Sequence, residues 1–190
     1  MGKLENGEGH RMTLTEIANR IGCDKGTTAH EKHGYTKIYE SAINEECTLL
    51  EIGIDNGLSL RMWAEWSEEL DLIAIDNRTE TMTDDLFMIA DLHHCDQGSV
   101  DSLEDFANGM CRVDVIIDDG SHRPNDQLLT LEVFWKLLRS GGKYFIEDLH
   151  CSAWFPEAER AHARITAFAK RTGAAHSFFC DNKLAMLVKP

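Results

Sequence analysis

The sequence predicts a single α/β domain built on a doubly wound, mostly parallel sheet. Its 190 residues are enough for one domain with its own hydrophobic core. From residue 48 onward, short apolar runs typical of buried strands alternate with segments of helical periodicity. Such alternation produces parallel strands joined by right-handed crossovers. Two apolar runs at 177–180 and 184–188, separated by three polar residues, predict a closing antiparallel hairpin.

Two helices are expected before the first strand. Thr13 and Glu16 have the spacing of a capping box, and Gly22 is a natural stop for the helix that they open. A second helix is expected over residues 35–43. The expected strands are 48–53, 72–75, 86–90, 113–117 and 143–146, and the expected helices between and after them are 58–70, 100–108, 125–138 and 156–170. Residues 140–142, Ser-Gly-Gly, are expected to end the third of these helices.

Composition argues against several classes of partner, although a local basic patch is still possible. The formal net charge of −14 argues against broad binding to nucleic acid or to an anionic membrane. No stretch approaches 18 apolar residues and the N-terminus lacks the apolar core of a signal peptide, so no membrane span is expected. The six cysteines form no Cys-x-x-Cys pair, which favours reduced thiols and a cytoplasmic location.

Acids and a histidine follow two of the expected strands. Asp118, Asp119 and His122 come after the first, and Glu147 and Asp148 come after the second. Ligands in open α/β sheets bind outside the carboxyl ends of the strands, so these side chains should face one crevice. Carboxylates suit a hard cation such as Mg²⁺, and an imidazole beside it could take a proton from a substrate hydroxyl. The alternative is that these acids only cap strands and form turns.

The first expected strand runs into a glycine turn. Glu51, Gly53, Asp55 and Gly57 occupy it, and the acid at position 55 departs from the three-glycine dinucleotide fingerprint. An acid there would repel a pyrophosphate and attract a cofactor that carries an ammonium and a sulfonium. This departure, together with the lack of a Tyr-x-x-x-Lys pair, disfavours a nicotinamide dehydrogenase. An ordinary strand–helix turn is the alternative.

Two further acids are expected at strand ends. Asp76 ends the second expected strand, where an acid can accept hydrogen bonds from ribose hydroxyls. Asp91 and Leu92 follow the expected strand 86–90, where a loop can lie along an adenine edge. Asp118 is assigned to the cofactor site as well, and it is the alternate metal ligand if the turn is shifted by one residue.

These motifs resemble the class I S-adenosylmethionine-dependent methyltransferases over residues 46–190. The stretch Asp119-Gly-Ser-His122 and the pair Glu147-Asp148 are more closely similar to the metal-dependent sugar O-methyltransferases of macrolide biosynthesis, the mycinamicin 2''-O-methyltransferase group. The resemblance implies that Asp119, Glu147 and Asp148 hold Mg²⁺ and that His122 is the general base. It also implies a Rossmann-like methyltransferase fold, with residues 46–190 as the S-adenosylmethionine-binding catalytic domain and residues 1–45 as a helical lead-in or lid.

The resemblance implies methyl transfer from S-adenosylmethionine to a hydroxyl of a sugar or glycosylated small molecule. A catechol-like acceptor and a non-catalytic S-adenosylmethionine-binding module remain alternatives, and a homo-oligomer is possible. Other residues keep two interpretations each: Lys25, His33 and Tyr35 could form a lid over the cofactor or simply pack. His150 could also face the crevice, and Trp154 and Phe155 could form an apolar wall for the acceptor or, as aromatics at a helix start, belong to the core.

Overall fold

The computed structural model describes residues 11–29, 32–151 and 161–190 and contains one seven-stranded sheet. The strand order is β3-β2-β1-β4-β5-β7-β6. Neighbours from β3 to β5 pair in parallel, whereas β7 runs antiparallel to β5 and to β6, which confirms the doubly wound sheet and its closing hairpin. The strands are β1 (Thr48–Ile52), β2 (Asp71–Asp76), β3 (Asp91–His94), β4 (Val113–Asp118), β5 (Leu138–Ile146), β6 (Ala175–Phe179) and β7 (Leu184–Val188).

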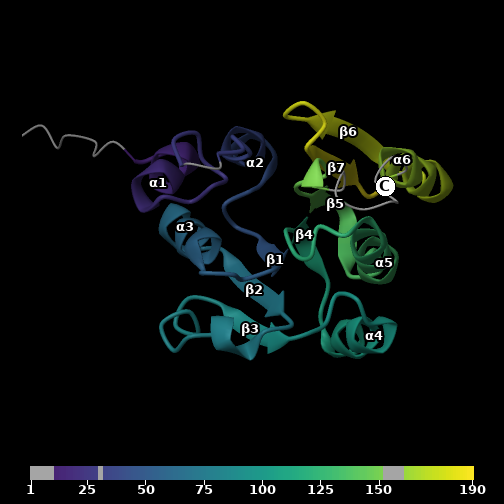
Figure 1. Cartoon of the computed structure of the whole chain (residues 1–190), viewed down its shortest axis with the longest axis horizontal. Helices are drawn as coiled ribbons and strands as arrows, with labels where there is room; N and C mark the ends of the chain where they lie inside the picture. Colours follow the sequence, from purple (N-terminus) through teal and green to yellow (C-terminus); the bar gives the residue numbers. More distant parts are fainter. Residues whose placement is uncertain (1–10, 30–31, 152–160) are drawn as a thin grey trace, which may run out of the picture.

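Helices cover both faces of the sheet (Figure 1). One core lies between the sheet and α1, α2 and α3, and the other lies between the sheet and α4, α5 and α6. The helices are α1 (Leu14–Ile21), α2 (Thr36–Ala42), α3 (Leu58–Trp66), α4 (Val100–Gly109), α5 (Pro124–Phe134) and α6 (Ala161–Thr172), with a short 3₁₀ helix at Thr79–Thr81. No helix in the described ranges is long and apolar enough to cross a membrane.

The described part of the N-terminal segment is packed into the first core. The capping box predicted for α1 is present, since the Thr13 hydroxyl accepts from the Glu16 amide while the Glu16 carboxylate accepts from the Thr13 amide. Leu14 in α1 and Tyr39 in α2 are completely buried, and the Tyr39 ring lies against Trp63 of α3. These two helices therefore complete the hydrophobic face that α3 begins.

The expected strand at 86–90 is wrong. Those residues form turns, and β3 begins at Asp91 and pairs in parallel with β2. Leu86 is buried and takes the space beside Gly57, where an added Cβ would lie 2.6 Å from a Leu86 methyl carbon, while Met88 is 83% exposed. The apolar run is a turn that places Leu86 and Ala90 in the core, and within the described residues it pairs with no neighbouring strand.

The expected helix 125–138 is too long. It ends at Phe134, and β5 already begins at Leu138, which pairs with Val113. Residues 140–142 lie inside this strand, where the ladder shifts register, so they do not end the helix. The Gly141 amide donates to the Lys189 carbonyl at 2.8 Å, which holds the glycines in the sheet. The expected helix 156–170 falls partly outside the described residues, and its described part is α6.

Candidate active site

Acids and a histidine converge where β4 and β5 end. The Asp119 amide donates to the Ile52 carbonyl of β1, and the Glu147 amide donates to the Asp118 carbonyl, both at 2.9 Å. These bonds hold the loop after β4 against the end of β1, and the loop after β5 against the end of β4. Asp119, His122 and Asp148 each offer one ligand atom, and these atoms all lie within 4.8 Å of one another. The structure thus brings together three of the predicted residues from two loops.

The backbone is strained at two of these three positions. His122 and Asp148 both have φ of 56°, in the left-handed region that side-chain-bearing residues seldom adopt. Such conformations persist where the surrounding structure enforces them, and they concentrate at functional sites. The chain therefore bears a conformational cost to aim these two side chains.

Lys25 enters this cluster from the N-terminal segment. Its ammonium donates to Asp119 Oδ2 and, at 3.0 Å, to Glu147 Oε2. The Lys25 side chain is 1% exposed. Burial alone would lower the pKa of Lys25, but the surrounding carboxylates outweigh burial and raise that pKa well above its usual value, so the group is charged. The sequence offered lid or packing for this residue, and neither interpretation predicted a direct ion pair with the acids.

Two tyrosines of the same segment also bind the acids. The Tyr39 hydroxyl donates to Glu147 Oε1 at 2.5 Å, and the Tyr35 hydroxyl donates to Asp148 Oδ1 at 2.7 Å. Both oxygens of Glu147 are therefore engaged, one by Tyr39 and the other by Lys25. Burial raises the pKa of Glu147 well above its usual value, and the charge of Asp119 adds to this effect. The sequence interpretation assigned no role to Tyr39.

Two more histidines surround Asp148. His33 Nδ1 lies 3.6 Å and His150 Nδ1 lies 3.9 Å from Asp148 Oδ1, and the three residues form a second group able to hold a metal ion. Burial lowers the pKa of His150, which favours its neutral form. The structure thus places His150 beside Asp148, one of the acids that follow β5. Trp154 and Phe155 lie outside the described residues.

Asp118 is directed away from this cluster. It is completely buried, and its Oδ1 accepts from the Gln97 amide nitrogen at 2.7 Å. Gln97 Oε1 in turn accepts from the Ser121 amide at 2.8 Å, so the pair holds the loop that carries Asp119 and His122. Burial raises the pKa of Asp118 to about 7. The register of the turn is therefore the one that presents Asp119, and Asp118 is no alternate ligand here.

The loop that follows β4 passes close to the backbone of the glycine turn after β1. Gly53 has φ of 98°, and a Cβ there would lie 2.2 Å from the Asp119 carbonyl oxygen. Glycine is required because the β4 loop crosses the backbone at this point. Gly57 caps α3 with φ of 73°. Asp55, with φ of 45°, is exposed at the tip of the turn, and Glu51 is completely buried below it. Burial raises the pKa of Glu51 to about 7, although Lys25 opposes the shift.

Asp76 ties this turn to β2. Its Oδ2 accepts from the Ile54 amide and its Oδ1 accepts from the Arg78 amide, both at 2.8 Å. The predicted place of Asp76 at the carboxyl end of β2 is correct. Oδ1 also accepts from Arg78 Nε at 3.4 Å, whereas Oδ2 keeps a second lone pair that could accept from a ribose hydroxyl.

The assignment of Asp91 and Leu92 to the cofactor site rested on the wrong strand. Both residues lie at the amino end of β3, and Asp91 pairs with Ile73 near the start of β2. Asp91 therefore lies three residues before the carboxyl edge of the sheet, where His94 pairs with Asp76. Asp96 and Gln97 follow the carboxyl end of β3 instead, and the sequence interpretation missed both.

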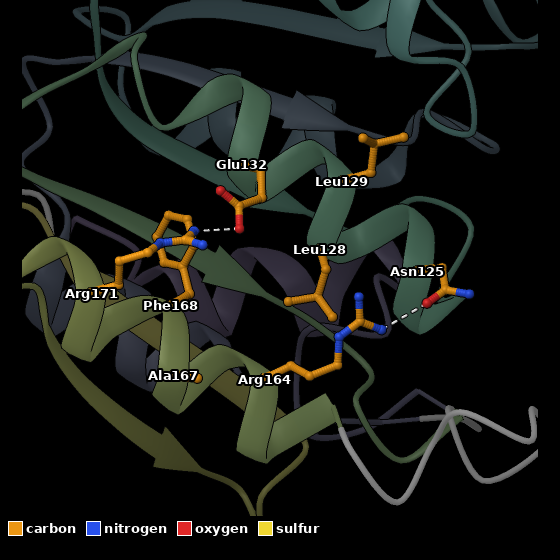
Figure 2. A pocket seen from close by; sticks show the side chains of 8 residues that line it. All are labelled: Asn125, Leu128, Leu129, Glu132, Arg164, Ala167, Phe168 and Arg171. Atoms are coloured by element: carbon orange, nitrogen blue, oxygen red, sulfur yellow. Dashed lines mark hydrogen bonds and ion pairs between the residues drawn. The ribbon is translucent and has the colours of Figure 1, made fainter.

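A separate cavity of about 680 Å³ lies between α5 and α6 (Figure 2). Leu128, Leu129 and Phe168 supply its apolar walls, while Arg164 donates to Asn125 at 2.7 Å at one end. None of the predicted site residues lines it. It is a groove between surface helices and is distinct from the cluster at the strand ends.

An open parallel sheet with an antiparallel hairpin, and with acids after three neighbouring strands, defines the class of α/β domains that bind a small cofactor at the sheet's carboxyl edge. A family model described as a methyltransferase domain matches residues 50–149. The chain belongs to this family.

Several known proteins are similar to the chain. A tetracenomycin rhamnosyl 2'-O-methyltransferase of Streptomyces olivaceus is 29% identical over 74% of this chain and 39% of its own length. Mycinamicin VI 2''-O-methyltransferase of Micromonospora griseorubida is 28% identical over 74% of this chain and 37% of its own length. The chain thus spans about two fifths of the curated relatives that it matches.

Solved structures confirm the fold. The MycE methyltransferase of the mycinamycin pathway, in complex with Mg and SAH, superposes with a TM-score of 0.78 at 20% identity. That match covers 95% of this chain and 55% of MycE. A putative caffeoyl-CoA O-methyltransferase from Staphylococcus aureus superposes with a TM-score of 0.66 at 15% identity and covers 95% of this chain. The Rossmann-like methyltransferase architecture that the motifs implied is therefore present.

Proposed function

We propose that this chain transfers a methyl group from S-adenosylmethionine to a hydroxyl of a sugar or glycosylated small molecule, with the help of a divalent cation such as Mg²⁺. The observation that carries the proposal is the convergence of Asp119, His122 and Asp148 at the carboxyl edge of the sheet. The curated relatives are named as O-methyltransferases that act on sugars of natural products, and the MycE structures contain Mg and SAH. Both facts support the proposal.

The donor set fits a hard cation. Asp119 and Asp148 offer carboxylate oxygens within 4.8 Å of each other, and Glu147 shares the Lys25 ion pair with Asp119. These three residues would hold the metal. When bound, the ion would lower the pKa of a substrate hydroxyl and so assist its deprotonation. Positioning of the hydroxyl opposite the methyl donor would supply much of the remaining rate enhancement.

His122 would accept the proton from the substrate hydroxyl. Its Nδ1 is buried and has no hydrogen-bond partner among the described residues, so a lone pair there is free for a ligand. The loop held by Gln97 fixes the ring beside Asp119 and Asp148. A base in that place can take the proton as the oxygen attacks the methyl group.

The cofactor would lie over the glycine turn. Asp76 would accept hydrogen bonds from the ribose, and Asp55 and the backbone near Gly53 and Gly57 would line the approach. Glu51 and Asp118 are completely buried, so they would support the turn and the β4 loop from below without touching the cofactor.

Metal dependence is the first test. The protein should transfer a labelled methyl group to a glycoside acceptor in Mg²⁺, lose the activity in EDTA, and recover it when Mg²⁺ is restored. Asp119→Asn should abolish transfer. The same change at Asp114, near the amino end of β4, should leave transfer near the parent rate. Activity that survives EDTA would contradict the metal proposal.

The base and the cofactor acid are tested separately. His122→Ala should lower the rate of transfer by roughly 10²–10⁴-fold while S-adenosylmethionine and Mn²⁺ still bind in calorimetry. Transfer at the parent rate would make His122 a bystander and leave His150 to be examined. Asp76→Ala should weaken cofactor binding by about 1–3 kcal/mol, and unchanged affinity would remove Asp76 from the site.

A further inference from the structure

Lys25 is a buried cation with no part in the proposed mechanism. Its backbone is fixed by a compact loop, in which the Thr36 amide donates to the Lys25 carbonyl at 3.1 Å and the Gly34 amide donates to the Gly26 carbonyl at 2.8 Å. The side chain of Asn19 in α1 accepts from the Thr27 amide at 2.7 Å and so ties the loop to the helix. The loop therefore delivers the ammonium group to a set position at the carboxyl edge of the sheet.

The ammonium lies where the proposed metal ligands meet. It donates to Asp119 and Glu147, two of the three acids that would hold the cation. These carboxylates come from neighbouring strand ends, and their negative charges repel each other unless a cation lies between them. A divalent cation bound by the same two residues would face a positive charge in direct contact with its ligands.

A third carboxylate offers the ammonium another position. Glu51 Oε1 lies 3.8 Å from Lys25 Nζ, and the Glu51 side chain is completely buried. Ser59 and Trp63 lie beside Glu51, yet neither of its oxygens has a hydrogen bond of ordinary geometry within the described residues. A buried carboxylate without hydrogen bonds is costly, so Glu51 would gain from a donor. A shift of the flexible lysine chain by about 1 Å would bring Nζ to the length of a charge-assisted hydrogen bond.

We propose that Lys25 is an internal counter-ion with two positions, and this inference rests on the metal site of the proposed function. Without a divalent cation, Nζ bridges Asp119 and Glu147 and keeps these acids together. When these acids bind the cation, Nζ moves to Glu51 and satisfies its buried oxygens. Lys25 is then a positioning residue that competes with the metal for its ligands and links the metal site to the strand beneath the cofactor turn.

The decisive measurement is Mn²⁺ affinity without cofactor or acceptor, read by electron paramagnetic resonance of the free ion. Lys25→Met keeps the length of the side chain and removes the charge. Because the competing cation is gone, Mn²⁺ should bind at least about fivefold more tightly. Lys136→Met removes a charge of equal size at the exposed lysine that bonds Asn108, and it should leave the affinity within about twofold of the parent value. A residue that only supports the fold would have the opposite effect, since its loss would weaken the site.

The second position is tested through Glu51. Glu51→Gln should weaken Mn²⁺ binding by about three- to tenfold, because the displaced ammonium then finds no charged acceptor. The same change should have a smaller effect when Lys25→Met is already present, and this non-additivity is the signature of a shared lysine position. Glu132→Gln, at a surface pair with Arg171, is the matched control and should change nothing.

Each outcome decides the inference. Tighter binding in Lys25→Met together with the non-additive Glu51 effect supports it. Unchanged or weaker binding in a folded Lys25→Met protein overturns it while the metal proposal stands. A parent protein that binds no Mn²⁺ overturns both. If Lys25→Met does not fold, Glu51→Gln in the parent decides: weaker binding supports the second position, and unchanged or tighter binding overturns it.

Discussion

The buried carboxyl group of Asp118 makes the stability of this protein dependent on pH in a direction opposite to that of most acids. Burial raises its pKa from 3.8 to about 7. In the unfolded chain the group ionises near its ordinary pKa, so between about pH 4 and pH 7 the folded chain binds the extra proton. The free energy of unfolding therefore falls as pH rises through this window. A difference of about 3 units, at 1.36 kcal/mol each, corresponds to a loss of roughly 4 kcal/mol.

Asp118→Asn should remove this loss. The asparagine oxygen can still accept from Gln97, and the amide resembles the protonated acid in shape and in having a donor. At pH 4, before the loss sets in, the variant and the parent should have similar free energies of unfolding. At pH 8 the variant should be the more stable one, by up to ~4 kcal/mol. Urea unfolding in EDTA at both pH values measures the difference.

Asp114→Asn on the same strand is the control with the opposite sign. Burial would raise the pKa of Asp114, but hydrogen bonds from Arg139 and from the Thr48 amide lower it, so this acid stabilises the fold when ionised. Its loss should therefore lower stability at pH 8. Glu51, whose pKa is also near 7, keeps part of the parent's slope in the Asp118 variant. Equal slopes between pH 5 and pH 8 for Asp118→Asn and the parent would refute the reasoning.

Three further substitutions test the architecture by chemical denaturation. Thr13→Ala removes the capping box with Glu16 and should cost about 1 kcal/mol, whereas no loss would mean that the cap is not used in solution. Gly53→Ala places a Cβ 2.2 Å from the Asp119 carbonyl oxygen at a positive φ, so it should unfold the protein or misplace the metal loop, and a stable variant with parent Mn²⁺ affinity would contradict the close approach. Phe134→Ala empties a completely buried position and should cost about 3–5 kcal/mol, and a cost under 1 kcal/mol would contradict the packing.

The order of elements and the chemistry at the strand ends were determined by local sequence. The capping box at Thr13 and the hairpin at 177–188 are signals carried by a few neighbouring residues, and the structure has both. Asp76 and Asp119 could be placed because an apolar run that ends in an acid is typical of a buried parallel strand that ends at a crevice.

Strand limits depended on pairing with distant residues. The run 86–90 is as apolar as a strand, but only β2 decides which residues of this region enter the sheet, and it pairs with Asp91–His94. The glycines at 141 and 142 read locally as a helix stop, whereas hydrogen bonds to the last residues of the chain draw them into β5. Local propensity does not contain these partners.

Contacts between distant residues also decided which side chains make up the site. Lys25 is 94 residues from Asp119 and 122 residues from Glu147 in the chain, yet its ammonium donates to both. Local sequence could name the acids, because each follows its own strand. It could not identify Lys25 as the cation between them. Burying a lysine is favourable only when enough carboxylates surround it, and only the tertiary structure brings those carboxylates together.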